Sequence, residues 1–135
     1  VRDFGLVPRV ALISHANFGA NTSASAARMR AAAQHLADLN VAFEFEGEMQ
    51  LNLAFDQSAR DQLLPCARLT DRPNILVFPS MDAARATIDA LVSLADAEPI
   101  GPILLGYGGK ANVVAPNVTA RGLLNVAAMA SAGRI

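Results

Sequence analysis

The chain has 135 residues, of which 53% are hydrophobic and 17% charged, and its formal net charge is -1. This composition is typical of a folded domain rather than a disordered tail, and the length suits one domain. The near-neutral charge gives no electrostatic reason to expect nucleic acid or an anionic membrane as a partner. No apolar run approaches the roughly 18 residues of a membrane helix. Because the chain starts at Val1 rather than Met, we expect a fragment of a longer protein.

The single cysteine, Cys66, excludes an internal disulfide and indicates a reducing, cytoplasmic compartment. No base stands beside it in sequence, so we expect an inert thiol. His15 and His35 lie far apart without cysteines or acidic clusters at ligand spacing, so the sequence predicts no metal site.

The first half of the chain predicts two strands and two helices. Residues 10–13 form a short apolar run typical of a buried strand, and a loop with Gly19 follows. Thr22 or Ser23 is expected to cap a helix that ends near Leu39. The predicted buried stripe of this helix is Ala26, Met29, Ala33, Leu36 and Ala37. Residues 43–46 alternate apolar and acidic side chains, as in an edge strand, and Asp56 is expected to cap a short helix before Pro65.

The second half repeats this order. Residues 75–78 predict a buried strand stopped by Pro79, and Ser80 is expected to cap a helix that ends near Ala95. The predicted inward face of that helix is Ala84, Ile88, Leu91, Val92 and Ala95. Residues 103–105 predict a third buried strand, followed by a glycine-rich turn. Asn117 or Thr119 is expected to cap the last helix. Its predicted apolar face is Leu123, Leu124, Ala127 and Ala130.

Alternating strands and helices predict an α/β fold, a three-layer sandwich with a mostly parallel sheet. The loop after the first strand leads into a helix N-terminus, which is a generic anion site. The glycine turn before the last helix is a second place where backbone can approach a ligand, with Lys110 as the cation beside it. His15 is expected to be an ordinary loop histidine, and a solvated surface lysine is an equally good reading of Lys110.

A series of segments stands out by its order and spacing along the chain. The segments are Ser14 with residues 17–19, then residues 47–50, 74–79, 100–106 and 118–122, and finally Asn125. Together they resemble the phosphate acetyltransferase fold, and most closely the copy of that fold at the C-terminus of bacterial NADP-dependent malic enzymes. The resemblance covers nearly the whole chain from Pro8 onward.

This resemblance implies the second of two subdomains, of the isocitrate/isopropylmalate dehydrogenase-like kind, over residues 1–135. It also implies a missing first subdomain, and a missing malic enzyme domain that uses NADP and a divalent metal. Active transferases carry a Ser-Arg pair and an aspartate near the last helix, which suit phosphate binding, charge stabilisation and proton transfer. Aligned here, those positions hold Ala115, Pro116 and Gly122, and Asn52 replaces another usual aspartate.

The resemblance therefore implies a regulatory domain without catalytic residues. It would bind acetyl-CoA as an effector of malate oxidative decarboxylation to pyruvate, need no cofactor of its own, and help to assemble a homo-oligomer. We expect the effector to contact a small set of residues from both glycine-containing loops: Ser14, Asn17, Gly19, Lys110 and Asn112. Two alternatives remain. One is part of an active acyltransferase whose catalytic residues lie on the missing subdomain, and the other is a purely structural oligomerisation domain.

Overall fold

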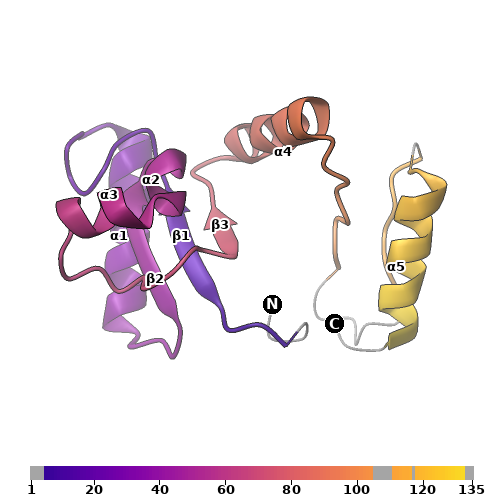
Figure 1. Cartoon of the computed structure of the whole chain (residues 1–135), viewed down its shortest axis with the longest axis horizontal. Helices are drawn as coiled ribbons and strands as arrows, with labels where there is room; N and C mark the ends of the chain where they lie inside the picture. The colour runs from indigo at the N-terminus through magenta and orange to yellow at the C-terminus, as the bar shows by residue number, and fades with distance from the viewer. Residues whose placement is uncertain (1–4, 105–110, 117, 133–135) are drawn as a thin grey trace. The chain divides into compact units, whose positions relative to one another are not determined.

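The structure is a computed structural model that describes residues 5–104, 111–116 and 118–132 (Figure 1). The chain divides into two compact units, Val1–Arg85 and Ala86–Ile135, each described here by itself. The elements in chain order are β1 (Arg9–Ile13), α1 (Ala24–Asp38), β2 (Glu44–Met49), α2 (Leu51–Phe55), α3 (Gln57–Leu63), β3 (Ile75–Val77), α4 (Met81–Ala95) and α5 (Ala120–Ala132).

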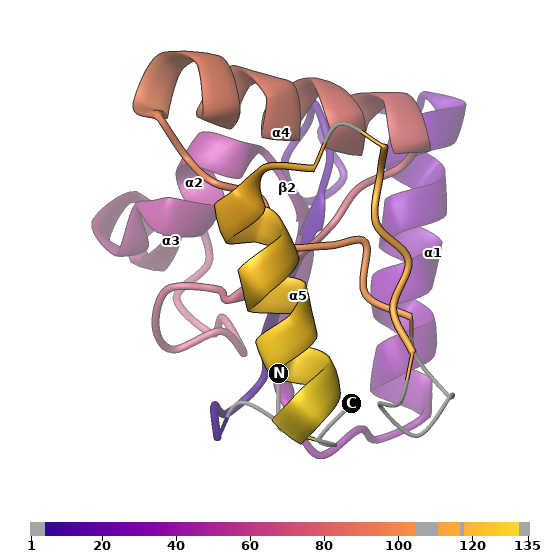
Figure 2. The ribbon, with the colours of Figure 1, turned by 90° about the vertical axis from the view of Figure 1, so that its right-hand side faces the viewer.

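The sheet of the first unit has three parallel strands in the order β2-β1-β3. Helix α1 lies on one side of the strands, and the short helices α2 and α3 lie on the other (Figure 2). Successive side chains of β1 point to opposite faces and therefore enter two different cores. Val10 and Leu12 pack with Met29, while Ala11 and Ile13 pack with Met49 and the residues of α2. The predicted three-layer α/β fold with a parallel sheet is confirmed.

The predicted capping residues explain where three helices begin. Ser23 caps α1 by accepting a hydrogen bond from the amide of Ala26, and Asp56 caps α3 in the same way. The hydroxyl of Ser80 accepts from the amide of Ala83 in the first turn of α4. In α1 the predicted stripe is buried or half-buried, so its assignment to the core is confirmed. Helix α2 was not expected from the sequence.

The burial predicted for the strand over residues 75–78 is only partly observed. Ile75, Leu76 and Phe78 are half-buried against the two cores. Only residues 75–77 form β3, which lies at an edge of the sheet, and Val77 remains 40% exposed. The run of apolar residues correctly predicts a strand. It does not reveal that β3 pairs with β1 on one side only among the described residues.

The strand predicted over residues 103–105 is absent from the described part of that segment. Residues 101–104 have no regular structure, and Leu105 lies outside the described residues. An apolar run becomes a strand only when another strand supplies hydrogen-bonding partners, and no strand of the described residues pairs with residues 101–104. The glycine turn of residues 106–109 also lies outside the described residues.

The predicted faces of α4 and α5 need correction. Helix α4 has no buried residue, and Ile88, Leu91 and Val92 are 43%, 50% and 39% exposed. An apolar stripe shows which face of a helix could be buried, but it does not supply the surface that would cover it. In α5, Leu123 and Leu124 are exposed, and the buried side consists of Gly122 and Val126.

Candidate functional site

The loop between β1 and α1 begins at the carboxyl end of the central strand, and the end of β2 holds it in place. The amide of Ser14 donates to the carbonyl of Met49 at 2.8 Å. Asn17 and Gln50 bond each other twice. The backbone amide of Gln50 donates to Asn17 Oδ1 at 2.7 Å, and the side-chain nitrogen Nδ2 of Asn17 donates to Gln50 Oε1 at 3.3 Å. Gln50 Nε2 also donates to the carbonyl of His15 at 2.9 Å. The loop is therefore ordered by contacts between residues about 33 positions apart.

Glu48 lies at the centre of this arrangement, and its side chain is completely buried. The register of β2 against β1 passes from Gly47 directly to Met49, so Glu48 is the extra residue of a β-bulge. Its carboxylate accepts from Arg30 Nε at 3.0 Å, from Arg30 Nη2 at 2.9 Å and from the amide of Gly19 at 2.9 Å. A bulge that turns a charged side chain inward thus joins the loop to the first half of α1.

The surroundings of Glu48 keep it ionised. Burial by itself would raise the pKa of this carboxyl group, but hydrogen bonds from Arg30 and the Gly19 amide, with the charge of Arg30, lower the pKa below its ordinary value. The same hydrogen bond raises the pKa of Arg30. Arg30 also donates to the carbonyl of Asn21 at 2.7 Å. One buried negative charge therefore bonds the loop at Gly19 and fixes an arginine that bonds the loop at Asn21.

Two adjacent loop residues have positive φ: Phe18 at 43° and Gly19 at 88°. The amide of Phe18 donates to the carbonyl of Glu48, and the amide of Gly19 donates to its carboxylate. These two backbone donors are consequently occupied inside the protein. Gly19 is one of the predicted effector residues, and its amide is occupied in holding the loop.

The N-terminus of α1 carries the polar groups on the exposed side of the loop. Ser23 Oγ lies 3.4 Å from His15 Nε2 and 3.4 Å from Ser25 Oγ. The first amides of any helix have no carbonyl partner within that helix, so Ala24 and Ser25 present donors at this end. Hydroxyl groups, a histidine and helix amides together suit a phosphate or carboxylate group.

The predicted effector residues are only partly brought together. Ser14, Asn17 and Gly19 lie in one loop, with the Ser14 side chain buried and its hydroxyl 3.4 Å from the Ala16 amide. Lys110 lies outside the described residues, and Asn112 is a half-buried residue of the second unit. Among the residues that the structure describes, no group of acidic, histidine or cysteine side chains could hold a metal ion, and Cys66 is exposed.

Three residues of this loop site were not predicted from the sequence: Arg30, Glu48 and Gln50. Arg30 lies outside the predicted buried stripe of α1, and its side chain is 42% accessible. A signal was present in the run Gly47-Glu-Met-Gln, because a glycine inside a strand often marks a bulge. At Gly47 an added Cβ would meet Leu12 O at 2.6 Å, so only glycine fits this close approach.

The second unit contains the positions where the resemblance expects catalytic residues. Ala115 and Pro116 are exposed and carry no ionisable group. Gly122 is buried, and its amide donates to Thr119 Oγ1 at 2.9 Å, which makes Thr119 the capping residue of α5. An added Cβ at Gly122 would lie 3.0 Å from Val118 Cγ2 and 3.2 Å from Thr119 Oγ1. The position is therefore too tight for an aspartate unless its neighbours move.

The fold is similar to that of solved phosphotransacetylases. A phosphotransacetylase from Streptococcus pyogenes matches with a TM-score of 0.84 and 22% identity, over 98% of this chain and 40% of that chain. The EutD phosphotransacetylase from Staphylococcus aureus matches with a TM-score of 0.82 and 22% identity, over 99% of this chain and 42% of that chain. At this level of identity the likeness shows the fold alone.

The chain belongs to the phosphate acetyl/butaryl transferase family, whose model matches residues 1–131. It is 42% identical over 130 residues to a NAD-dependent malic enzyme of Rhizobium meliloti, which covers 96% of this chain and 17% of that protein. It is 35% identical over 131 residues to a NADP-dependent malic enzyme of Haemophilus influenzae, which covers 97% of this chain and 17% of that protein. A phosphate acetyltransferase of Paracoccus denitrificans is 33% identical over 122 residues, which covers 90% of this chain and 38% of that protein.

These matches confirm the predicted resemblance to the phosphotransacetylase-like region of malic enzymes. The chain spans only 17% of the length of the malic enzymes that it matches. No helix in the described part of the chain is long and apolar enough to cross a membrane.

Proposed function

We propose that this chain is a regulatory domain of a malic enzyme, that it binds acetyl-CoA as an effector, and that it has no transferase activity of its own. The observation that carries the proposal is the replacement of the expected catalytic groups by Ala115, Pro116 and Gly122 in a chain similar to malic enzymes over nearly its whole length. None of these side chains can bind phosphate through a charge or accept a thiol proton. The tight packing around Gly122 supports a role in helix packing at that position.

The loop after β1 is the proposed effector-binding element of the first unit. Asn17 and Gly19 shape this loop from inside, since their polar groups already bond to Gln50 and Glu48. The contacts to a phosphate or carboxylate of the effector would come from the exposed side, at Ser25 and the first amides of α1. A preformed loop lowers the entropic cost of binding. Lys110 and Asn112 are also proposed as effector contacts, because they follow the glycine turn and Lys110 is the cation beside it.

Binding is tested by calorimetry with acetyl-CoA on the full-length protein. We expect Asn17→Ala combined with Lys110→Ala to weaken binding by about tenfold or more, because the double variant loosens the loop and removes a cation. Gln62→Ala, at an exposed position of α3, is the matched control and should leave the affinity unchanged. Unaltered binding by the double variant would place the effector elsewhere, and no binding at all would favour a purely structural role.

Activity is tested by two assays on the same preparation. The rate of malate-dependent formation of NADH or NADPH should change when acetyl-CoA is added. Comparing the rates with the two coenzymes shows whether the protein resembles the NAD-dependent or the NADP-dependent malic enzymes in its coenzyme use. Acetyl phosphate formation from acetyl-CoA should be absent; turnover within about a hundredfold of an active transferase would refute the inactive reading. Light scattering of the same protein with and without this region tests its proposed role in oligomer assembly.

A further inference from the structure

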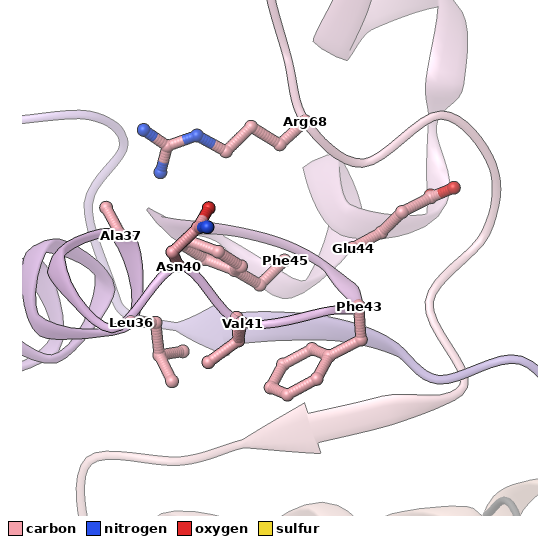
Figure 3. A pocket seen from close by; sticks show the side chains of 8 residues that line it. All are labelled: Leu36, Ala37, Asn40, Val41, Phe43, Glu44, Phe45 and Arg68. Atoms are coloured by element: carbon pink, nitrogen blue, oxygen red, sulfur yellow. The ribbon is translucent and has the colours of Figure 1, made fainter.

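A hollow lies near the start of β2, at the end of the sheet opposite to the loop site. It has a volume of about 310 Å³, and Figure 3 shows the side chains around it. They come from the last turn of α1, the connection to β2, β2 itself and the segment before β3. The lining residues are Leu36, Ala37, Asn40, Val41, Phe43, Glu44, Phe45 and Arg68. The hollow lies within the first unit and shares no lining residue with the loop site.

Aromatic and aliphatic side chains form much of the wall. Phe43 and Phe45 are two residues apart, so their side chains leave the chain on the same side, and their rings meet edge to face at 6.4 Å. Phe45 is 5% exposed and belongs to the core, whereas Phe43, Leu36 and Val41 are half-buried and pack against it. These half-buried groups give an apolar ligand a surface to cover.

Arg68 brings a positive charge to this wall and is held in position from two sides. Its guanidinium carbon lies 5.0 Å from the centre of the Phe45 ring, and its amide donates to Glu46 Oε2 at 2.8 Å. Among the residues that the structure describes, no carboxylate forms a salt bridge with the Arg68 side chain. Arg68 is exposed, and its guanidinium lies over an aromatic ring with its N–H groups available, which suits a planar carboxylate.

The one acidic residue of the wall does not compete for Arg68. The carboxylate of Glu44 accepts from the amide and the hydroxyl of Thr70, each at 3.0 Å. In Figure 3 the Glu44 side chain extends to the side away from the Arg68 guanidinium. The hollow therefore places half-buried apolar side chains next to an arginine that has no carboxylate partner among the described residues. The Glu44 carboxylate, which also lines the hollow, is hydrogen-bonded to Thr70.

We propose that this hollow binds a small organic carboxylate with a compact apolar body, such as a single ring or a branched chain. The carboxylate would take hydrogen bonds from Arg68, and the apolar body would lie against Phe43, Leu36 and Val41. The volume is at the lower end of the range for small-molecule sites, which limits the ligand to about that size. This binding site is separate from the proposed acetyl-CoA site and does not depend on it.

The test uses phenylacetate as the probe and its neutral analogue phenylacetamide as the chemical control, with ligand-observed NMR titrations on the full-length protein. Phenylacetate should bind saturably in the millimolar range, and phenylacetamide about tenfold more weakly because it lacks the charge. Arg68→Gln should weaken phenylacetate binding by about tenfold or more. Arg72→Gln, an exposed arginine of the same segment, should keep the affinity within about twofold.

A second variant tests the place of binding without changing any charge. Ala37→Leu fills the hollow from α1, and leucine is a good helix former, so the helix should persist while phenylacetate binding is lost. Ala31→Leu, at an exposed position of the same helix, is the matched control and should bind normally. The proposal is overturned by any of three results: no saturable binding up to about 10 mM, equal affinity for the amide, or unchanged affinity in Arg68→Gln or Ala37→Leu.

Discussion

Replacing Glu48 by glutamine tests the buried ion pair that shapes the loop after β1. Glutamine has the same shape as glutamate, so the substitution removes the charge without leaving a cavity. The native carboxylate is fully buried and accepts hydrogen bonds from Arg30 and from the amide of Gly19, at distances from 2.9 to 3.2 Å. A glutamine can accept with one atom only, and its amide nitrogen would face donors.

The cost follows from these contacts. Losing a hydrogen bond to a charged group costs about 1.5–3 kcal/mol, and a buried donor without an acceptor costs about 1–3 kcal/mol. The full penalty of a broken buried pair does not apply, because the Arg30 side chain is 42% exposed and stays hydrated. We therefore expect Glu48→Gln to lower the free energy of unfolding by about 2–3 kcal/mol. For a domain of this size that is roughly 6–10 °C in melting temperature.

The effect should depend on pH in one direction. The pKa of Glu48 is lower in the folded protein than its ordinary value of 4.5, so the ionised form stabilises the fold. This stability is fully present above pH 4.5 and is lost as the pH falls through the lower, folded-state pKa. The difference in unfolding free energy between the native protein and Glu48→Gln should thus be larger at pH 7 than near about pH 3.

Urea unfolding at both pH values measures these differences, and hydrogen exchange at the amide of Gly19 reports on the loop itself. The matched control is Glu44→Gln on the same strand. Among the described residues its carboxylate bonds only to Thr70 at the surface, so the loss of its charge should cost under about 1 kcal/mol. Two results would refute the reasoning: a Glu48→Gln protein within about 0.5 kcal/mol of the native one, or a difference that does not change with pH. Unchanged exchange at Gly19 would show that the pair does not hold the loop.

Two further substitutions test the packing of the first unit by urea unfolding. Gly47→Ala should cost about 3 kcal/mol or more, because the new Cβ would lie 2.6 Å from Leu12 O and 2.8 Å from Leu12 Cβ. Gly5→Ala is its control, at a φ of 72° with nothing within 4 Å, and should cost only about 1 kcal/mol. Arg60 is fully buried with its Nε unpaired, so Arg60→Ala should cost about 3 kcal/mol through lost volume and two lost bonds to carbonyls. Arg60→Met fills the same space, so its free energy of unfolding should fall clearly less than that of Arg60→Ala. An equal fall in both variants would show that the hydrogen bonds matter more than the filled volume.

The sequence by itself determined those features that depend on neighbouring residues. The apolar run of residues 10–13 formed β1, and the capping residues Ser23 and Asp56 began α1 and α3 where predicted. A short side chain that accepts a hydrogen bond two or three residues ahead acts locally, so its effect can be recognised without the fold. The alternation of strands and helices likewise predicted the parallel sheet and its three layers.

Tertiary structure decided which of these elements are covered and where the charges lie. The apolar faces of α4 and of residues 75–77 were predicted to be buried and are largely or partly exposed, because burial needs a second surface that periodicity cannot reveal. Glu48 stands in an acidic, edge-strand sequence and is nevertheless completely buried. Its partner Arg30 lies 18 residues earlier, and only the bulge in β2 turns the carboxylate toward it. Contacts between such distant residues arise from the path of the chain in space, which is why the sequence predicts the loop after β1 but not the contacts that order it.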